Sequence, residues 1–242
     1  MSEPTPPALD ATALAAQLQH DPTAALATLI PIAQRGDVQA QFLLGQACME
    51  GRGIPQDPAA AVLWFERAAN GGLGIAMNML GRCHELGSGT VQNLELAAVW
   101  YRKAADSGLD WGMYNLANLL GTGRGVTRDE PAAFALYLQA ARLGHAKSMN
   151  LVGRCLEDGV GVAADPAAAP AWYLRSAEAS DFRGQASHAS VLLAAGEIDA
   201  AAAWLERALA HGSPSFLAHL RTALAASPHA ALRALVDPPS TR

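Results

Sequence analysis

Cys83 and His84 are adjacent in the sequence and are the first residues that could support chemistry. A thiol beside an imidazole can act as a nucleophile, and both residue types bind zinc. In a helix, however, neighbouring side chains point about 100° apart, so a metal would need ligands from distant parts of the chain. The other histidines show no zinc-ligand spacing. We therefore expect Cys83 and His84 to pack in the core, with no metal and no cofactor.

Glu85 and Glu157 are the candidate carboxylates for acid–base catalysis. Each follows an arginine by three residues, Arg82 and Arg154 respectively, which is the spacing of an ion pair on a helix surface. The chain also lacks the sequence motifs of serine hydrolases, zinc proteases and nucleotide-binding P-loops. These observations favour surface ion pairs, and we expect that the protein is not an enzyme.

Pairs of glycines recur every 36 residues and resemble phosphate-binding turns. They are Gly51/Gly53, Gly87/Gly89, Gly123/Gly125 and Gly159/Gly161. A dinucleotide-binding loop needs a strand before it and a third glycine at the start of the next helix, and neither is expected here. We predict turns in which these glycines adopt positive φ angles.

The same period extends to other positions and determines the predicted fold. Four kinds of residue recur in phase: a helix-capping residue, a pair with an aromatic member, a pair of small residues and a closing glycine or serine. They are Asp57, Asn93, Asp129 and Asp165; Trp64-Phe65, Trp100-Tyr101, Leu136-Tyr137 and Trp172-Tyr173; Ala68-Ala69, Ala104-Ala105, Ala140-Ala141 and Ser176-Ala177; Gly72, Gly108, Gly144 and Ser180. Repeats of this length are typical of solenoid proteins.

We predict an all-α, right-handed α-α superhelical solenoid forming one domain over residues 8–226. Four regular units span residues 37–72, 73–108, 109–144 and 145–180. A degenerate unit lies at each end, at 8–36 and 181–212, and the second is shortened where its glycine loop should be. A capping helix spans 213–226. Residues 1–7 are expected to be disordered, and 227–242 to form a short turn and a flexible tail.

Each unit should contain a helix A before the glycine pair and a helix B after it. Helix A buries residues at i, i+4 and i+8, such as Ala40, Leu44 and Cys48. The residues of helix B expected to be buried are Ala61, Trp64, Phe65 and Ala68. The expected N-cap and N1 pairs are Asp21-Pro22, Asp57-Pro58 and Asp165-Pro166. Pro31 and Pro170 fall inside predicted B helices, where proline should kink the helix or delay its start.

Composition narrows the function and the location. The net charge of −5 gives no sign of the basic surface that nucleic-acid binding requires. No apolar run is long enough to cross a membrane, and the N-terminal residues do not resemble a secretion signal. Three sparse cysteines do not form a disulfide framework and fit a reducing compartment. We expect a cytoplasmic protein that binds neither nucleic acid nor membrane.

The repeat resembles the Sel1-like repeat, a relative of the tetratricopeptide repeat. One copy of the motif is Ala40, Leu44-Gly45, Gly51-Arg52-Gly53-Ile54, Asp57, Ala61, Trp64-Phe65, Ala68-Ala69 and Gly72. The resemblance covers residues 37–180 strongly and 8–36 and 181–212 weakly, and it implies an adaptor, scaffold or assembly role. A cysteine-rich branch of the family is associated with β-lactam binding, so a hydrolase or β-lactam-binding protein is an alternative. That branch carries paired cysteines in every repeat, which this chain lacks.

A second stripe on helix A, one turn away from the packing face, is the predicted binding site. In such repeats the A helices line the concave groove, and this stripe should place amides, guanidiniums and aromatic rings there. Its members are Phe42, Gln46, Asn78, Arg82, Trp111, Tyr114, Asn118, Lys147, Asn150 and Arg154. Amides can pair with an extended peptide backbone, and arginines can bind carboxylates. The alternatives are a merely solvated face, or a structural component that self-associates. We expect a monomer or weak homo-oligomer that binds a protein or peptide.

Overall fold

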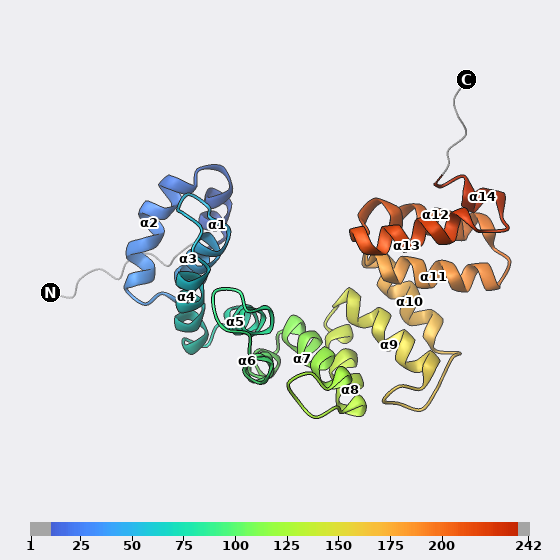
Figure 1. Ribbon diagram of the computed structural model, residues 1–242, viewed down its shortest axis with the longest axis horizontal. Coiled ribbons are helices and arrows are strands. Elements are labelled where there is room, and N and C mark those ends of the chain that lie inside the picture. The colour runs from blue at the N-terminus through green and yellow to red at the C-terminus, as the bar shows by residue number, and fades with distance from the viewer. Residues whose placement is uncertain (1–10, 237–242) are drawn as a thin grey trace, which may run out of the picture. The chain divides into compact units, whose positions relative to one another are not determined.

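The computed structural model describes residues 11–236, which form helices joined by short connections and contain no strand (Figure 1). The helices are α1 Ala11–His20, α2 Pro22–Gln34, α3 Val38–Glu50, α4 Pro58–Asn70, α5 Gly74–Leu86, α6 Leu94–Asp106, α7 Asp110–Thr122, α8 Glu130–Arg142, α9 Ala146–Asp158, α10 Ala169–Glu178, α11 Phe182–Ala194, α12 Ile198–His211, α13 Pro214–Ala225 and α14 Ala230–Arg233. The N-terminal segment 1–7 and the tail residues 237–242, for which the sequence predicts disorder, lie outside the described residues.

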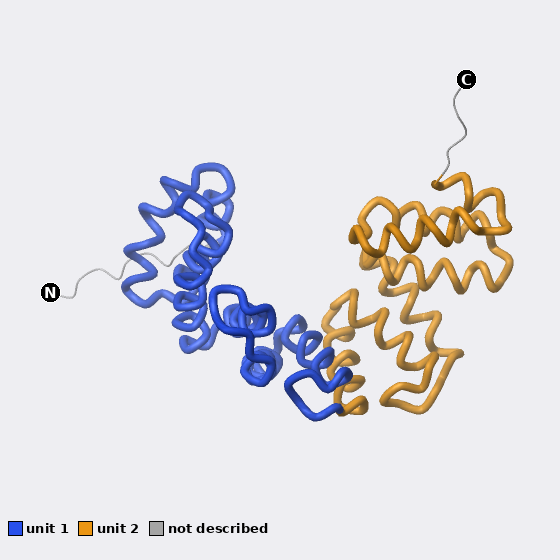
Figure 2. Tube along the Cα trace, viewed as in Figure 1, with its two compact units in different colours: residues 1–128 blue, residues 129–242 orange. Residues whose placement is uncertain are grey.

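The chain divides into two compact units, residues 1–128 and 129–242 (Figure 2). In unit 1, α3 packs against α4 and α5 against α6, so each of these two repeats is a hairpin of an A and a B helix. In unit 2, α9 packs against α10 and α11 against α12 in the same way. The A helices of consecutive repeats also contact each other, α5 with α7 and α9 with α11. Within each unit a repeat therefore completes its packing on its neighbour, as a solenoid requires.

The predicted packing face of helix A is confirmed: Ala40, Leu44 and Cys48 are all buried. In helix B, Ala61, Phe65 and Ala68 are fully buried, whereas Trp64 is only partly buried. The Arg67 guanidinium stacks on the Trp64 ring, 4.5 Å from the ring centroid. The same stacking recurs between Lys103 and Trp100, Arg175 and Trp172, and Arg207 and Trp204. The tryptophan thus covers the edge of the core while a cation shields its outer face.

The predicted caps hold for most B helices. The side chains of Asp21, Asp57, Asn93 and Asp129 each accept a hydrogen bond from a backbone N–H of the first helical turn. The expected cap at Asp165-Pro166 is wrong, because Asp165 caps a separate turn and α10 begins only at Ala169. Pro170 stands at the start of α10 and so delays the helix. α2 instead continues through Pro31.

The glycine pairs form turns with positive φ, as predicted. Their second glycine also brings the loop against the B helix of the preceding repeat. A Cβ on Gly89 would lie 2.1 Å from the Pro58 carbonyl oxygen, and one on Gly125 would lie 2.4 Å from the Leu94 carbonyl carbon. The shortened loop between α11 and α12 has no such contact, since nothing lies within 4 Å of a Cβ built on Gly196. The last repeat therefore lacks the close contact between the loop and the preceding B helix that the earlier loops form.

Candidate functional site

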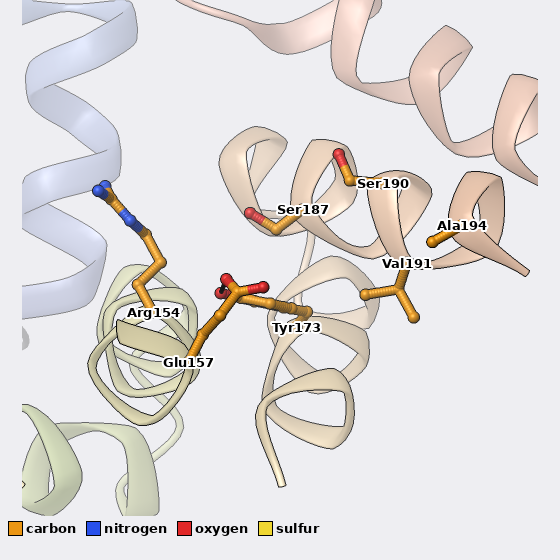
Figure 3. Close-up of a pocket in the computed structure, with 7 residues that line it drawn as sticks. All are labelled: Arg154, Glu157, Tyr173, Ser187, Ser190, Val191 and Ala194. Carbon is orange, nitrogen blue, oxygen red and sulfur yellow. Dashed lines mark hydrogen bonds between the residues drawn. The ribbon is translucent and has the colours of Figure 1, made fainter. Parts of the chain in front are cut away.

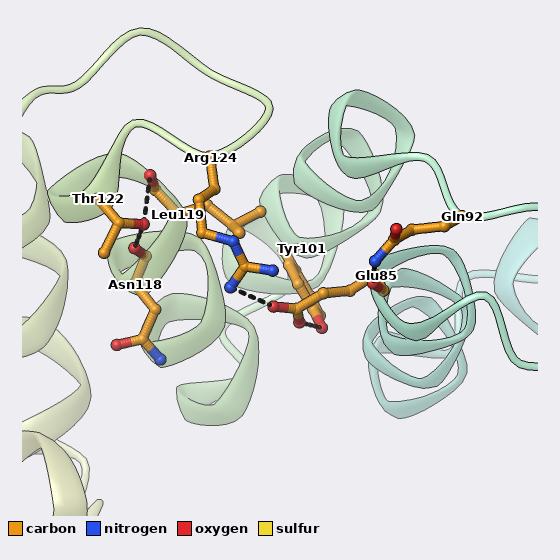
Figure 4. Close-up of polar contacts among 7 residues, drawn as sticks. All are labelled: Glu85, Gln92, Tyr101, Asn118, Leu119, Thr122 and Arg124. Carbon is orange, nitrogen blue, oxygen red and sulfur yellow. Dashed lines mark hydrogen bonds and ion pairs between the residues drawn. The ribbon is translucent and has the colours of Figure 1, made fainter.

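A polar cluster in unit 1 joins α5, α6 and the loop after α7. The Tyr101 hydroxyl donates a 2.7 Å hydrogen bond to Glu85 Oε2, and Arg124 Nη1 lies 3.4 Å from Glu85 Oε1 (Figure 4). Glu85 therefore pairs with Arg124 of the next repeat, and the expected ion pair with Arg82 is wrong. On the far side of the cluster, the Thr122 hydroxyl donates to a backbone carbonyl of its own helix.

Tyr101 reaches Glu85 because its ring lies directly on a helical glycine. The ring is fully buried, and a Cβ added to Gly81 would lie 2.7 Å from two of its carbons. Burial first, and then the hydrogen bond and the negative charge of Glu85, raise the pKa of the Tyr101 hydroxyl far above its usual range. The hydroxyl therefore stays protonated and acts as a fixed donor.

Unit 2 contains the same tyrosine–glutamate pair in a more open setting. The Tyr173 hydroxyl donates a 2.5 Å hydrogen bond to Glu157 Oε2, and the ring lies on Gly153 as that of Tyr101 lies on Gly81. Burial, followed by the hydrogen bond to Glu157, raises the pKa of Tyr173 far above its usual range.

A pocket of about 360 Å³ opens beside this second pair. It is lined by Arg154, Glu157, Tyr173, Ser187, Ser190, Val191 and Ala194 (Figure 3). The Arg154 side chain extends away from Glu157 in this view, and in the described part of the chain no cation pairs with that glutamate (Figure 3). The ion pair expected between Arg154 and Glu157 is therefore not formed.

The predicted stripe divides in unit 1 between the core and the surface. Phe42 is 6 % exposed and packs against the Phe65 ring at 5.8 Å between centroids, so it belongs to the core. Asn78 is also buried, and its Oδ1 accepts a 2.8 Å hydrogen bond from Asn115. Gln46 is half-buried. Phe42 thus joins helices A and B of its own repeat, and Asn78 joins two neighbouring A helices.

The remaining unit 1 members of the stripe are accessible. Arg82 is exposed on α5, while Tyr114 and Asn118 are half-buried on α7. Trp111 is 43 % exposed, and its ring meets that of Tyr114 edge-on at 6.1 Å. Because residues 111, 114 and 118 share one face of α7, the aromatic pair and the amide form one continuous surface.

In unit 2 the stripe is represented on α9. Arg154 is exposed and Lys147 is half-buried. Asn150 is only 3 % exposed, and within the described residues its Oδ1 has no hydrogen-bond partner. A buried amide oxygen without a partner is uncommon.

The cysteine and histidine candidates are packing residues. Burial raises the pKa of the Cys83 thiol to about 11, so at neutral pH it is protonated and a poor nucleophile. His84 is buried, and desolvation lowers its pKa. All three cysteines are free thiols. Among the described residues no three His, Cys, Asp or Glu side chains lie together as metal ligands.

Sequence reasoning missed several residues of these clusters, namely Tyr101, Asn115, Arg124, Tyr173, Ser187 and Ser190. One signal was available, because a tyrosine follows each glutamate by 16 residues in both units. Arg124 carried no such signal, since it belongs to a loop of the next repeat.

Paired antiparallel helices repeating along the chain define an α-helical repeat protein. The family model for the Sel1 repeat matches residues 38–73, 74–109, 112–145, 146–181 and 197–213. The chain therefore belongs to the Sel1 repeat family. Proteins of this family are typically non-catalytic adaptors, and their repeats generally mediate protein–protein interaction. A search of curated proteins found no match.

Solved structures share the fold. A Sel1 repeat protein from Oxalobacter formigenes aligns with a TM-score of 0.80 at 24 % identity, over 89 % of this chain and 90 % of that protein. The protective antigen c5321 of uropathogenic Escherichia coli, which displays an SLR fold, aligns with a TM-score of 0.73 at 25 % identity. This alignment covers 88 % of this chain but 48 % of the antigen, so the chain spans about half its length. The immunity protein Pa5087 of Pseudomonas aeruginosa is more distant, with a TM-score of 0.56 at 16 % identity.

No helix within residues 11–236 is both long and apolar enough to span a membrane.

Proposed function

We propose that this protein is an adaptor or scaffold that binds an extended segment of a partner protein on the exposed face of its A helices. The observation that carries the proposal is the Trp111–Tyr114 pair on α7, an aromatic surface with Trp111 43 % exposed. Exposed tryptophan and tyrosine side chains are the commonest anchors of protein interfaces, because they bury a large area with little loss of conformational entropy.

Polar groups next to the aromatic pair supply the means to orient a bound segment. Asn118 lies one turn further along α7, and Arg82 occupies the equivalent position on the contacting helix α5. An amide can donate to and accept from a peptide backbone, and a guanidinium can bind a carboxylate or carbonyl oxygen. The aromatic rings would then provide the affinity and the polar groups the register of the bound chain.

Selection of peptides from a displayed random library against the purified protein tests this proposal. The double substitution Trp111→Ala/Arg82→Ala should weaken binding of the selected peptides at least tenfold. A matched control is Val99→Ala/Arg102→Ala, which removes an exposed apolar side chain and an arginine from the B helix α6. Equal loss in both variants, or none in the first, would refute the assignment of this face.

A further inference from the structure

The two tyrosine–glutamate clusters occupy equivalent positions two repeats apart. Helices α5 and α9 begin at residues 74 and 146, and α7 and α11 begin at residues 110 and 182, so both pairs are displaced by 72 residues. Glu85 and Tyr101 thus correspond to Glu157 and Tyr173, and the hydrogen bond between the partners is retained. The wall that faces each glutamate comes from the next A helix, α7 in unit 1 and α11 in unit 2.

That wall is built from smaller side chains in unit 2. At every compared position a residue of α7 or its loop is replaced by a shorter one, and the only charge is lost. The replacements are Asn115 by Ser187, Asn118 by Ser190, Leu119 by Val191, Thr122 by Ala194 and Arg124 by Gly196. Four of the smaller residues, Ser187, Ser190, Val191 and Ala194, line the pocket beside Glu157 (Figure 3).

The unit 1 cluster shows which group the pocket lacks. Arg124 places its guanidinium against the free oxygen of Glu85, while Tyr101 holds the other oxygen (Figure 4). In unit 2, Tyr173 holds Oε2 of Glu157 in the same way, and no cation of the described chain approaches Oε1. A carboxylate held by one fixed donor and facing an open pocket is therefore set to accept a second donor from outside.

A second sign of an unfilled site lies next to it on α9. The Oδ1 of Asn78 accepts a hydrogen bond from Asn115, whereas the Oδ1 of Asn150, its equivalent, has no partner in the described structure. The residue equivalent to Asn115 is the shorter Ser187. An incoming group rich in N–H donors would meet acceptors at Glu157 and at the hydroxyls of Ser187 and Ser190, which line the pocket. The Val191 and Ala194 side chains offer an apolar wall to an aliphatic stem.

We propose that the Glu157 pocket binds the guanidinium of an arginine side chain in a partner polypeptide, which takes the place that Arg124 fills beside Glu85. The inference rests on the proposed function, since it names a side chain that the partner protein would present to unit 2. A guanidinium fits better than an ammonium because its planar array of donors can bond the carboxylate and a hydroxyl together.

Isothermal titration with short capped peptides tests this proposal. Acetyl-Gly-Arg-Gly-amide should bind at one site, and its citrulline counterpart, which has the same shape without the charge, should bind at least tenfold more weakly. Free arginine serves as a further arm, because weaker binding of the free amino acid identifies a polypeptide as the source of the guanidinium. If free arginine binds more tightly than the capped peptide, the pocket is a small-molecule site and the proposal is wrong.

Two variants locate the binding. Glu157→Gln keeps an acceptor for Tyr173 but removes the charge, and Ala194→Phe fills the pocket from the exposed end of α11 while leaving Glu157 in place. Each should reduce peptide affinity at least tenfold with an unchanged helical circular dichroism spectrum. Undiminished binding in both variants would overturn the proposal. Failure of the capped arginine peptide to bind, together with library-selected peptides that depend on Trp111, would also overturn it, while leaving the proposed function intact.

Discussion

Glu85 in unit 1 and Glu157 in unit 2 are held by the same tyrosine arrangement and differ in the residues around it. In both, a buried tyrosine lies on a helical glycine and donates a hydrogen bond to the glutamate. In unit 1 the next repeat closes the site with Arg124, whereas in unit 2 the next repeat has a short loop and small side chains. The comparison teaches that a repeat supplies the tyrosine, the glycine and the glutamate, and that side chains of the next repeat determine whether the glutamate is covered or open to a ligand.

Removal of either tyrosine ring should have the largest effect, and a similar one in both units. Tyr101→Ala and Tyr173→Ala each empty a buried aromatic site, and such substitutions cost about 3–5 kcal/mol of unfolding free energy. Urea denaturation followed by circular dichroism measures the loss. A loss of unfolding free energy below about 1 kcal/mol in one unit only would show that the two tyrosines are not equivalent.

Alkaline pH should destabilise the protein through both tyrosines. Their pKa values in the folded state are raised, so above about pH 10 the unfolded chain loses phenolic protons that the folded chain keeps. Stability is then fully present below pH 10 and falls by up to about 1.4 kcal/mol per pH unit per tyrosine. Denaturation curves at pH 9 and 11 test this effect. The loss of unfolding free energy between pH 9 and 11 should be smaller in Tyr101→Phe and in Tyr173→Phe. An unchanged loss in both variants would contradict the raised tyrosine pKa values.

Loss of the hydroxyl alone should distinguish the units. Tyr101→Phe leaves a glutamate whose side chain is only 22 % exposed, and the change should cost about 1–2 kcal/mol. Tyr173→Phe should cost less, because water can reach the exposed Glu157 and replace the lost donor. The difference in urea midpoint between the two variants is the measurement. A larger loss for Tyr173→Phe would reverse the comparison.

The Arg124–Glu85 pair should contribute least to stability. Both side chains reach solvent, and such pairs contribute about 0–1 kcal/mol. Arg124→Ala should therefore leave the unfolding free energy almost unchanged, and the small difference from the parent should shrink at high salt. A loss of several kcal/mol would mean that the arginine is a structural support and not a removable cap.

Much of the fold could be predicted from the sequence because the repeat imposes the same local requirements in each copy. Caps such as Asp57 and glycine turns such as Gly51/Gly53 are local features, and the i, i+4 pattern of helix A follows from helix geometry. Pro170 is the instructive exception. A proline at this position predicts either a kink in the helix or a late helix start. In the structure α10 starts late, after a separate turn over the residues that follow Asp165.

The candidate sites could be predicted only in part, because they depend on contacts between repeats. Phe42 and Asn78 occupy equivalent positions in the predicted stripe, yet both are buried, Phe42 against Phe65 of its own repeat and Asn78 against Asn115 of the adjoining one. The Glu157 pocket arises from side chains that are small or missing on α11, and no motif marks such an absence. Aligning the residues around Glu85 with those around Glu157, once the contacts are known, makes the difference visible.

The most direct test of the central claim is to observe both glutamates together while an arginine peptide is added. Nuclear magnetic resonance of the isotope-labelled protein, with acetyl-Gly-Arg-Gly-amide as the probe, follows the residues around Glu85 and Glu157 separately. We predict shifts around Glu157 alone in the parent protein, and around both glutamates in Arg124→Ala, where removal of the guanidinium opens the first site. Shifts that avoid Glu157 in the parent, or no new site at Glu85 in the variant, would contradict the account.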